Sequence, residues 1–100
     1  MKEIREFINC ELENMESFIK YAQKTCKKEL KEIDMDEHVA KIEEWEKIAV
    51  RSIKDMKSEC DGAIWFAYRI GMITNEQRSD LHRQMLDNYM DKISEVYEKI

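Results

Sequence analysis

Apolar residues recur every three or four positions along three stretches of the chain, about residues 2–33, 36–70 and 75–99. This spacing places apolar side chains on one face of an α-helix, whereas a half-buried strand alternates every second residue. The pattern therefore predicts three amphipathic helices. The periodic positions are Ile4, Ile8, Leu12, Met15, Ile19, Ala22, Cys26, Leu30 and Ile33, then Val39, Ile42, Trp45, Ala49, Ile53, Met56, Cys60, Ile64, Ala67 and Ile70, then Leu81, Met85, Tyr89, Ile93, Val96 and Ile100.

Two short corners separate these stretches. The phase of the apolar stripe breaks at about residues 34–36, where Asp34 and Glu37 stand three apart as in a variant of the capping box. At the second corner, Gly71 fits the left-handed position that ends many helices. The following segment Thr74-Asn75-Glu76-Gln77 has the sequence of a capping box. We therefore expect one helix to end and another to begin at each corner.

Short corners between amphipathic helices favour packing of each helix antiparallel to the one before it. The expected fold is all-α: an antiparallel up-down-up bundle of three helices in a single domain, residues 1–100. One alternative stays open, because Asp61-Gly62 looks like a helix stop although the apolar stripe passes through it without a change of phase. The second helix is either continuous and weakened at Gly62, or broken at 61–62.

Composition supports helices and narrows the class of protein. The chain has 100 residues, no proline and two glycines, which argues against the frequent tight turns of a β-sandwich or barrel. Its longest apolar run, residues 63–67, is far shorter than a membrane span. Residues 1–6 lack the apolar segment of a secretory signal. We therefore expect a cytoplasmic protein that does not act at a membrane.

Basic residues form a lysine stripe on one face of the first helix, Lys20, Lys24, Lys27, Lys28 and Lys31. One interpretation is a site for a phosphorylated nucleotide, built by Lys20, Lys24, Lys27 and Arg51 of the second helix. The favoured interpretation is that the stripe pairs with acidic residues across the helical hairpin, which adds roughly 0–1 kcal/mol per exposed pair. The net charge of −5 argues against direct binding of nucleic acid.

Acidic residues gather in the block 32–46, which carries seven carboxylates against the single basic residue Lys41. On an exposed corner these groups could face a basic groove of another protein, as inhibitors that mimic nucleic acid do. Solvated surface and pairing within the hairpin is the more ordinary interpretation. The candidate contact residues are Glu37, Glu43, Glu44 and Glu46.

Aromatic residues crowd the end of the second helix, where Trp65, Phe66 and Tyr68 surround the helix rather than follow one stripe. Most of this group should belong to the core at one pole of the bundle. A helix that is apolar all round needs cover on several sides, and three thin helices supply little. Part of the group is therefore a candidate protein interface, and the expected partner is a second copy of the chain.

No constellation in the sequence points to catalysis, a cofactor or a metal. Cys10, Cys26 and Cys60 are widely spaced and are expected to be small buried hydrophobes. Neither His38 nor His82 follows a glutamate at the spacing of a di-iron bundle. No nucleophile–base pair or glycine-rich phosphate loop is present, so we expect a protein that is not an enzyme.

Residues 61–77, Asp61-Gly62-Ala63-Ile64-Trp65-Phe66-Ala67-Tyr68-Arg69-Ile70-Gly71-Met72-Ile73-Thr74-Asn75-Glu76-Gln77, resemble a pattern of small helical proteins from phages and mobile elements of low-GC Gram-positive bacteria. In that pattern a helix ends in a turn of the type Ala-Tyr-x-x-Gly-x-Ile-Thr, and a capped helix follows. The excess of Lys over Arg (12 against 5) and of Ile over Leu (12 against 4) fits an AT-rich genome. The resemblance implies an accessory protein that acts by binding, such as an anti-CRISPR inhibitor, and transfers no individual functional residue.

The sequence thus favours a non-enzymatic binding module that occludes a larger protein, plausibly a nucleic-acid-binding effector of a bacterial defence system. Two alternatives stay open. One is a small-ligand binder that sequesters a phosphorylated nucleotide through the lysine stripe. The other is a structural homodimeric helical adaptor.

Overall fold

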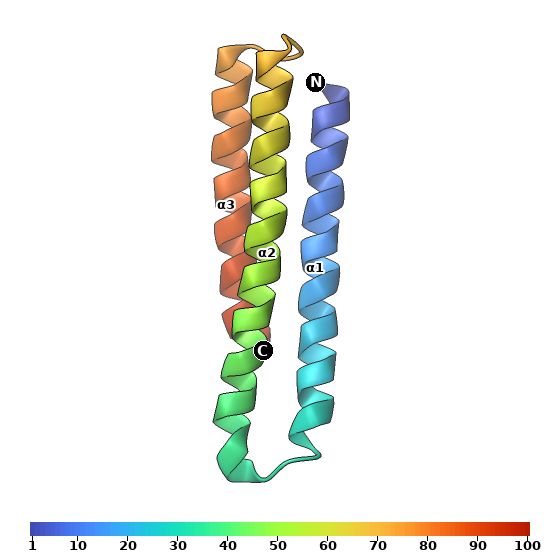
Figure 1. The fold of residues 1–100 in the computed structure, drawn as a ribbon, viewed down its shortest axis with the longest axis vertical. Coiled ribbons are helices and arrows are strands. Elements are labelled where there is room, and N and C mark those ends of the chain that lie inside the picture. The colour runs from blue at the N-terminus through green and yellow to red at the C-terminus, as the bar shows by residue number, and fades with distance from the viewer.

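Three long α-helices run alternately down, up and down the molecule in the computed structural model, which describes residues 1–100 (Figure 1). They are α1 (Lys2–Leu30), α2 (His38–Arg69) and α3 (Asn75–Lys99), and a single 3₁₀ turn, η1 (Met35–Glu37), precedes α2. The chain forms no strand, so the predicted all-α antiparallel bundle is confirmed. The bundle measures 56 × 17 × 16 Å. None of its helices combines the length and the hydropathy of a bilayer span.

The first corner differs from its prediction. Helix α1 ends at Leu30 rather than near residue 33, and the chain then turns before η1. The predicted capping box does not form, because neither Asp34 nor Glu37 accepts a capping hydrogen bond through its side chain. Instead the backbone carbonyl of Asp34 accepts the Glu37 amide at 3.0 Å, which closes the 3₁₀ turn. A corner without glycine or proline leaves its boundaries weakly defined in the sequence.

The second corner forms as predicted. Gly71 has φ +81°, and the amides of Gly71 and Met72 donate to the carbonyls of Tyr68 (3.1 Å) and Ala67 (2.9 Å). These two bonds are a Schellman motif, which satisfies the last carbonyls of α2. Thr74 then accepts the Gln77 amide through its hydroxyl, and the Gln77 side chain accepts the Thr74 amide. The capping box at the start of α3 is therefore confirmed.

The core is a single apolar stripe down the bundle axis. Fifteen side chains are buried and none of them is polar. Ile4 and Leu81 of the predicted apolar stripes are among them, as is Ile73 from the second corner. The largest fully buried side chains are Met15, Ile19, Ile53, Cys60, Ile64, Met85 and Val96.

Helix α2 is continuous through Gly62, so the alternative of a break at 61–62 is wrong. Gly62 is exposed, and a Cβ added there meets nothing within 4 Å. Because glycine in a helix interior is unfavourable, Gly62→Ala should raise the free energy of unfolding by about 0.5–1 kcal/mol. Urea denaturation measures this change. The matched control is Gly71→Ala, which should destabilise the protein because alanine is strained at positive φ; equal effects at both glycines would contradict this account.

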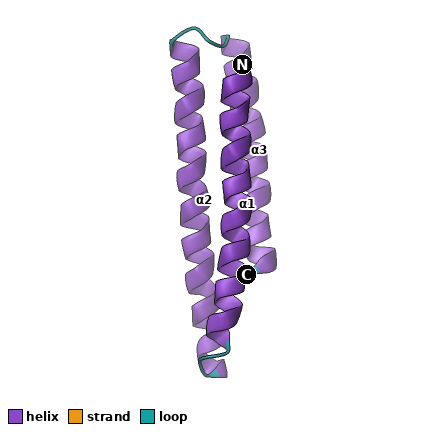
Figure 2. Cartoon of the chain, turned by 90° about the vertical axis from the view of Figure 1, so that its right-hand side faces the viewer, coloured by secondary structure: helices purple, strands orange, loops and turns teal.

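Helix α3 covers only part of the α1–α2 hairpin, as both views of the ribbon show (Figures 1 and 2). Its last turn is held beside the middle of α1, where Lys92 and Lys99 lie 2.7 and 3.7 Å from the carboxylate of Glu16. Beyond this point the molecule consists of α1 and α2 alone. We call this two-helix end, residues 24–46, the hairpin tip.

Candidate interaction surfaces

The hairpin tip is held together by Trp45 of α2. Its indole N–H donates to Glu29 Oε2 of α1 at 2.6 Å, and its ring packs edge-on against Tyr21 with the centroids 6.1 Å apart. Lys41 adds a contact to Glu29 at 3.9 Å. Because a part-buried indole whose donor is satisfied fixes its helix in one register, the tip is an ordered surface rather than a pair of loose helix ends.

Acidic residues line the corner of the tip, as predicted from the sequence. Glu37, Glu43 and Glu44 are exposed and Glu46 is half-buried. Of these four carboxylates, only that of Glu44 has a basic partner within 4.0 Å, namely Lys41 at 3.2 Å. The hydrogen bond that Lys41 donates to the Glu44 carboxylate raises the pKa of the Lys41 ammonium. The carboxylates of the other three are therefore available to an outside partner.

A shallow hollow opens within this acidic corner. Its floor is apolar, from Ile33 and Ala40, and its rim is formed by Glu37, Glu44 and Lys41. A recess with an apolar floor and an acidic rim suits the aliphatic stem and charged head of a lysine or arginine side chain. Two of the four acidic residues proposed from the sequence, Glu37 and Glu44, thus line a feature that the sequence alone did not reveal, whereas Glu43 and Glu46 lie outside it.

The lysine stripe of α1 does not pair with the acidic block, so the favoured interpretation of the stripe is wrong. Lys20, Lys24, Lys27, Lys28 and Lys31 are all exposed, and none lies within 4.0 Å of a carboxylate oxygen. The one ion pair across the tip has the opposite polarity, with the carboxylate on α1 and the lysine on α2. Side chains of a helix are spaced about 100° apart around its axis, and the lysine stripe therefore falls outside the face of α1 that packs against α2.

The residues proposed to bind a phosphate lie on two separate surfaces. Lys20, Lys24 and Lys27 point outward from α1, and Arg51 is exposed on the side of α2 opposite the buried residues Ala49 and Ile53. Arg51 lines a hollow made by α2 residues alone, and none of the surface hollows is lined by the three lysines. The structure therefore does not bring these four side chains together around one ligand.

Trp65 and Tyr68 form an aromatic cluster with residues of α3. Their rings meet edge-on with centroids 6.1 Å apart, and the Arg78 guanidinium lies 4.5 Å above the Trp65 ring. His82 packs against Trp65 with the ring centroids 5.4 Å apart. Its Nδ1 lies 3.2 Å from Asp61. The cluster therefore joins α2 to α3 while half of Trp65 (47%) stays exposed.

Phe66 departs from the expectation that the pole is a closed aromatic core. Its side chain is 63% exposed and Phe7 of α1 is 40% exposed, whereas Tyr68 is half-buried. Successive residues on a helix point about 100° apart, so Trp65 and Phe66 cannot both face the core that Ile64 occupies. The predicted aromatic group is thus divided between a cluster with α3 and a side chain in solvent.

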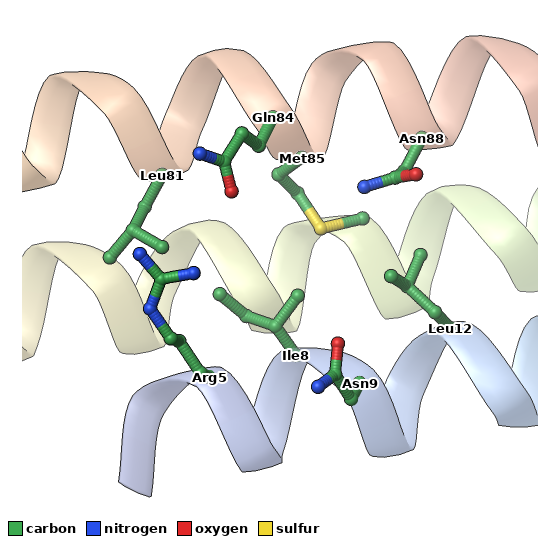
Figure 3. A pocket seen from close by; sticks show the side chains of 8 residues that line it. All are labelled: Arg5, Ile8, Asn9, Leu12, Leu81, Gln84, Met85 and Asn88. Atoms are coloured by element: carbon green, nitrogen blue, oxygen red, sulfur yellow. The ribbon is translucent and has the colours of Figure 1, made fainter. Parts of the chain in front are cut away.

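A small groove separates α1 from α3 (Figure 3). Arg5 and Asn9 of α1 and Gln84 and Asn88 of α3 stand around it, above the apolar side chains. Its volume is about 90 Å³, whereas sites for small organic ligands occupy roughly 300–1,000 Å³. The groove suits a few water molecules rather than a nucleotide.

The cysteines and histidines give no reactive centre. Cys26 and Cys60 are buried as predicted, but Cys10 is exposed, which corrects the expectation for that residue. Burial raises the pKa of the Cys60 thiol to about 12, so it stays protonated and unreactive at neutral pH. The Nε2 of His82 is buried without a hydrogen-bond partner. No group of three or more potential ligands converges on a metal site.

No protein-family model, curated protein or solved structure matches this chain.

Proposed function

We propose that the protein is a non-enzymatic binding module whose hairpin tip docks on a larger protein and occludes a basic surface of that protein. The observation that carries the proposal is the acidic corner, where Glu37, Glu43 and Glu46 have no basic partner and where Glu37 and Glu44 line a hollow with an apolar floor. Complementary charge steers such an encounter and selects the partner. The apolar floor supplies area to bury at the contact.

The shape of the molecule supports this mode of action. A rod 56 Å long with a tip of only two helices can reach into a groove that a globular domain of the same length would not enter. The tip is fixed by the Trp45–Glu29 hydrogen bond. A surface that is already ordered loses less conformational entropy on binding.

The first test is charge reversal at the acidic corner. Binding partners are isolated on the immobilised protein, and the affinity of each is measured by isothermal titration calorimetry for the wild type and for Glu43→Lys/Glu44→Lys/Glu46→Lys. We expect the variant to bind about tenfold more weakly or worse and to lose most of the salt dependence, because the electrostatic attraction is removed. Circular dichroism should show unchanged helicity, since Glu43 and Glu44 are exposed and Glu46 is half-buried.

The matched control reverses three exposed glutamates in the first half of α1, away from the tip, Glu3→Lys/Glu6→Lys/Glu13→Lys. It changes the net charge by the same amount and should leave affinity within about twofold, because charges beyond a Debye length are screened. Equal losses in both variants would show an unspecific charge effect. Unchanged binding in the tip variant would refute docking through the acidic corner.

The resemblance of residues 61–77 gives the proposal its most concrete form, an inhibitor of a bacterial defence system of the anti-CRISPR type. Expressed in a bacterium with an active CRISPR system, the protein should restore plaque formation by a phage that the system targets. The tip variant should fail to do so. No restoration by the wild type would reject this form while leaving the affinity test of the tip to decide the binding module.

Sequestration of a phosphorylated nucleotide is the alternative that the unpaired lysine stripe supports. It predicts that a nucleotide panel shifts the thermal unfolding of the isolated protein, and that Lys20→Ala/Lys24→Ala/Lys27→Ala removes the shift. We expect no shift, because no hollow is lined by these lysines. A purely structural adaptor predicts neither a nucleotide shift nor a heterologous partner.

A further inference from the structure

Helix α3 carries a second apolar stripe on its outer side, apart from the one in the core. Leu86, Met90 and Tyr97 are 49%, 56% and 61% exposed, and Ile93 lies between them half-buried. The steps from residue to residue are four, three and four. This is the heptad spacing with which one helix packs lengthwise against another, and the exposure of Leu86, Met90 and Tyr97 shows that no other helix of the chain covers the stripe. We call these four residues the outer stripe.

Opposite charges flank the outer stripe. Asp87, Asp91 and Glu98 are all exposed. Each directly follows a residue of the outer stripe, so it points about 100° further round α3, away from the side where Tyr89 and His82 contact α2.

Across the stripe, Lys47 and Lys54 of α2 are exposed. Lys57 contacts Tyr89 of α3, and helical spacing places Lys54 three residues before it, and Lys47 a further seven, on the same side of α2. None of the five exposed groups takes part in an ion pair within the chain. The surface is therefore an apolar seam between an unpaired basic edge and an unpaired acidic edge.

The register of α2 against α3 sets which charges share a level. Lys57 Nζ lies 5.4 Å above the ring centre of Tyr89, and the two helices run antiparallel. A residue one turn before Lys57 in α2 therefore lies beside a residue one turn after Tyr89 in α3. By this count Lys54 lies within one residue of the level of Asp91, and Lys47 within one residue of the level of Glu98.

We propose that the outer stripe is covered by a second copy of this chain, with α3 packed parallel to α3 of the partner around a two-fold axis along the helices. Rotation about such an axis places the basic edge of one copy against the acidic edge of the other. It also keeps every residue at the same height along the axis. Lys54 then faces the partner's Asp91, and Lys47 faces the partner's Glu98. An antiparallel pair would set basic edges against each other and acidic edges against each other, so the charges select the parallel arrangement.

The dimer leaves the hairpin tips free and places both at the same end of the assembly. Residues 24–46 lie beyond the end of α3, so they do not contribute to the α3–α3 seam. The proposal therefore does not rest on the binding function of the tip, and each is tested by variants that leave the other surface intact.

The first experiment is sedimentation equilibrium over a range of protein concentrations. The wild type should approach twice the 12.1 kDa of one chain, and Leu86→Glu/Met90→Glu should stay at the mass of one chain, with unchanged helicity because both side chains are already half-exposed. The matched control, Phe66→Glu/Ile70→Glu, alters two equally exposed apolar residues away from the stripe and should remain dimeric. A monomeric wild type at the highest soluble concentration, or a stripe variant that stays dimeric, would overturn the proposal.

A charge swap tests the direction of packing. Lys47→Glu/Lys54→Glu should dissociate the dimer at low salt, and adding Asp91→Lys/Glu98→Lys in the same chain should restore it, because every pair is again of opposite sign. In an antiparallel dimer the second pair of changes would restore nothing. Oxidation of Met90→Cys in a Cys10→Ser background should also link position 90 to itself, since identical residues meet across a parallel seam; absence of that link would refute the parallel arrangement.

Discussion

Replacing Ile64 by alanine is expected to lower the free energy of unfolding by about 2–5 kcal/mol, the largest effect of any single change considered. Ile64 is completely buried in the core between the three helices. Removal of its outer carbons forfeits their transfer free energy and leaves a cavity that the long, stiff helices close only partly. The free energy of unfolding of a domain of this size is about 5–15 kcal/mol in total, so the variant should be close to unfolding at ambient temperature. Urea titration followed by circular dichroism measures the change.

The control for this prediction is Ile48→Ala, which removes the same carbons from a 38% exposed position of the same helix. We expect a change of less than about 1 kcal/mol there, because the side chain already meets water. A loss at Ile64 no greater than that at Ile48 would mean that the axis of the bundle is not the closed core described above.

Acidification should destabilise the protein through Glu16, which ties α1 to the end of α3. The hydrogen bond from Lys92 and the contact with Glu95 lower the pKa of the Glu16 carboxyl from 4.5 to about 2, against the opposing effect of burial. A carboxyl with a lowered pKa in the folded state stabilises the protein above its unfolded pKa and ceases to do so as the pH falls through the folded value. Between about pH 4.5 and pH 2 the wild type should therefore lose about 2 kcal/mol of stability from this group.

Urea titrations at pH 7 and pH 2.5 compare the wild type with Glu16→Gln. The variant should be less stable at neutral pH and should lose less stability on acidification, whereas Glu13→Gln, an exposed glutamate of the same helix, should behave as the wild type. The pKa of Glu59 is raised by Glu11 and shifts stability in the opposite sense, which is why the difference between variants is the informative quantity. Identical acid sensitivity of the wild type and Glu16→Gln would contradict the assignment.

The second corner could be predicted from the sequence because its local chemistry is specific, whereas the boundaries of the first corner could not. Gly71 is needed for a positive φ, and Thr74 and Gln77 satisfy each other's amides. Both requirements are met by residues close together in the chain, so they produce a recognisable sequence motif. Helix α1 instead ends at Leu30 without a glycine, and its end depends on where the hairpin packs.

Periodicity located the helices and predicted the buried stripe of α3, but it did not reveal that a second apolar stripe of the same spacing stays exposed. On α3 the buried stripe contains Leu81 and Met85, and the outer stripe contains Leu86 and Met90 at the same spacing. The two stripes differ in whether α1 and α2 lie against them, and the positions of those helices around α3 are a property of the assembled bundle. The expected pairing of the lysine stripe failed for a related reason, because residues that are level along a hairpin still point to different sides of their helices.

The uncovered hairpin tip also bears on how the molecule unfolds. In the upper bundle each helix touches two others, but residues 24–46 have only one neighbouring helix. Fewer buried contacts mean that this segment opens locally at a lower free energy than the rest. The Trp45–Glu29 hydrogen bond holds this segment closed for most of the time, and a protein bound at the tip would make its local opening rarer still.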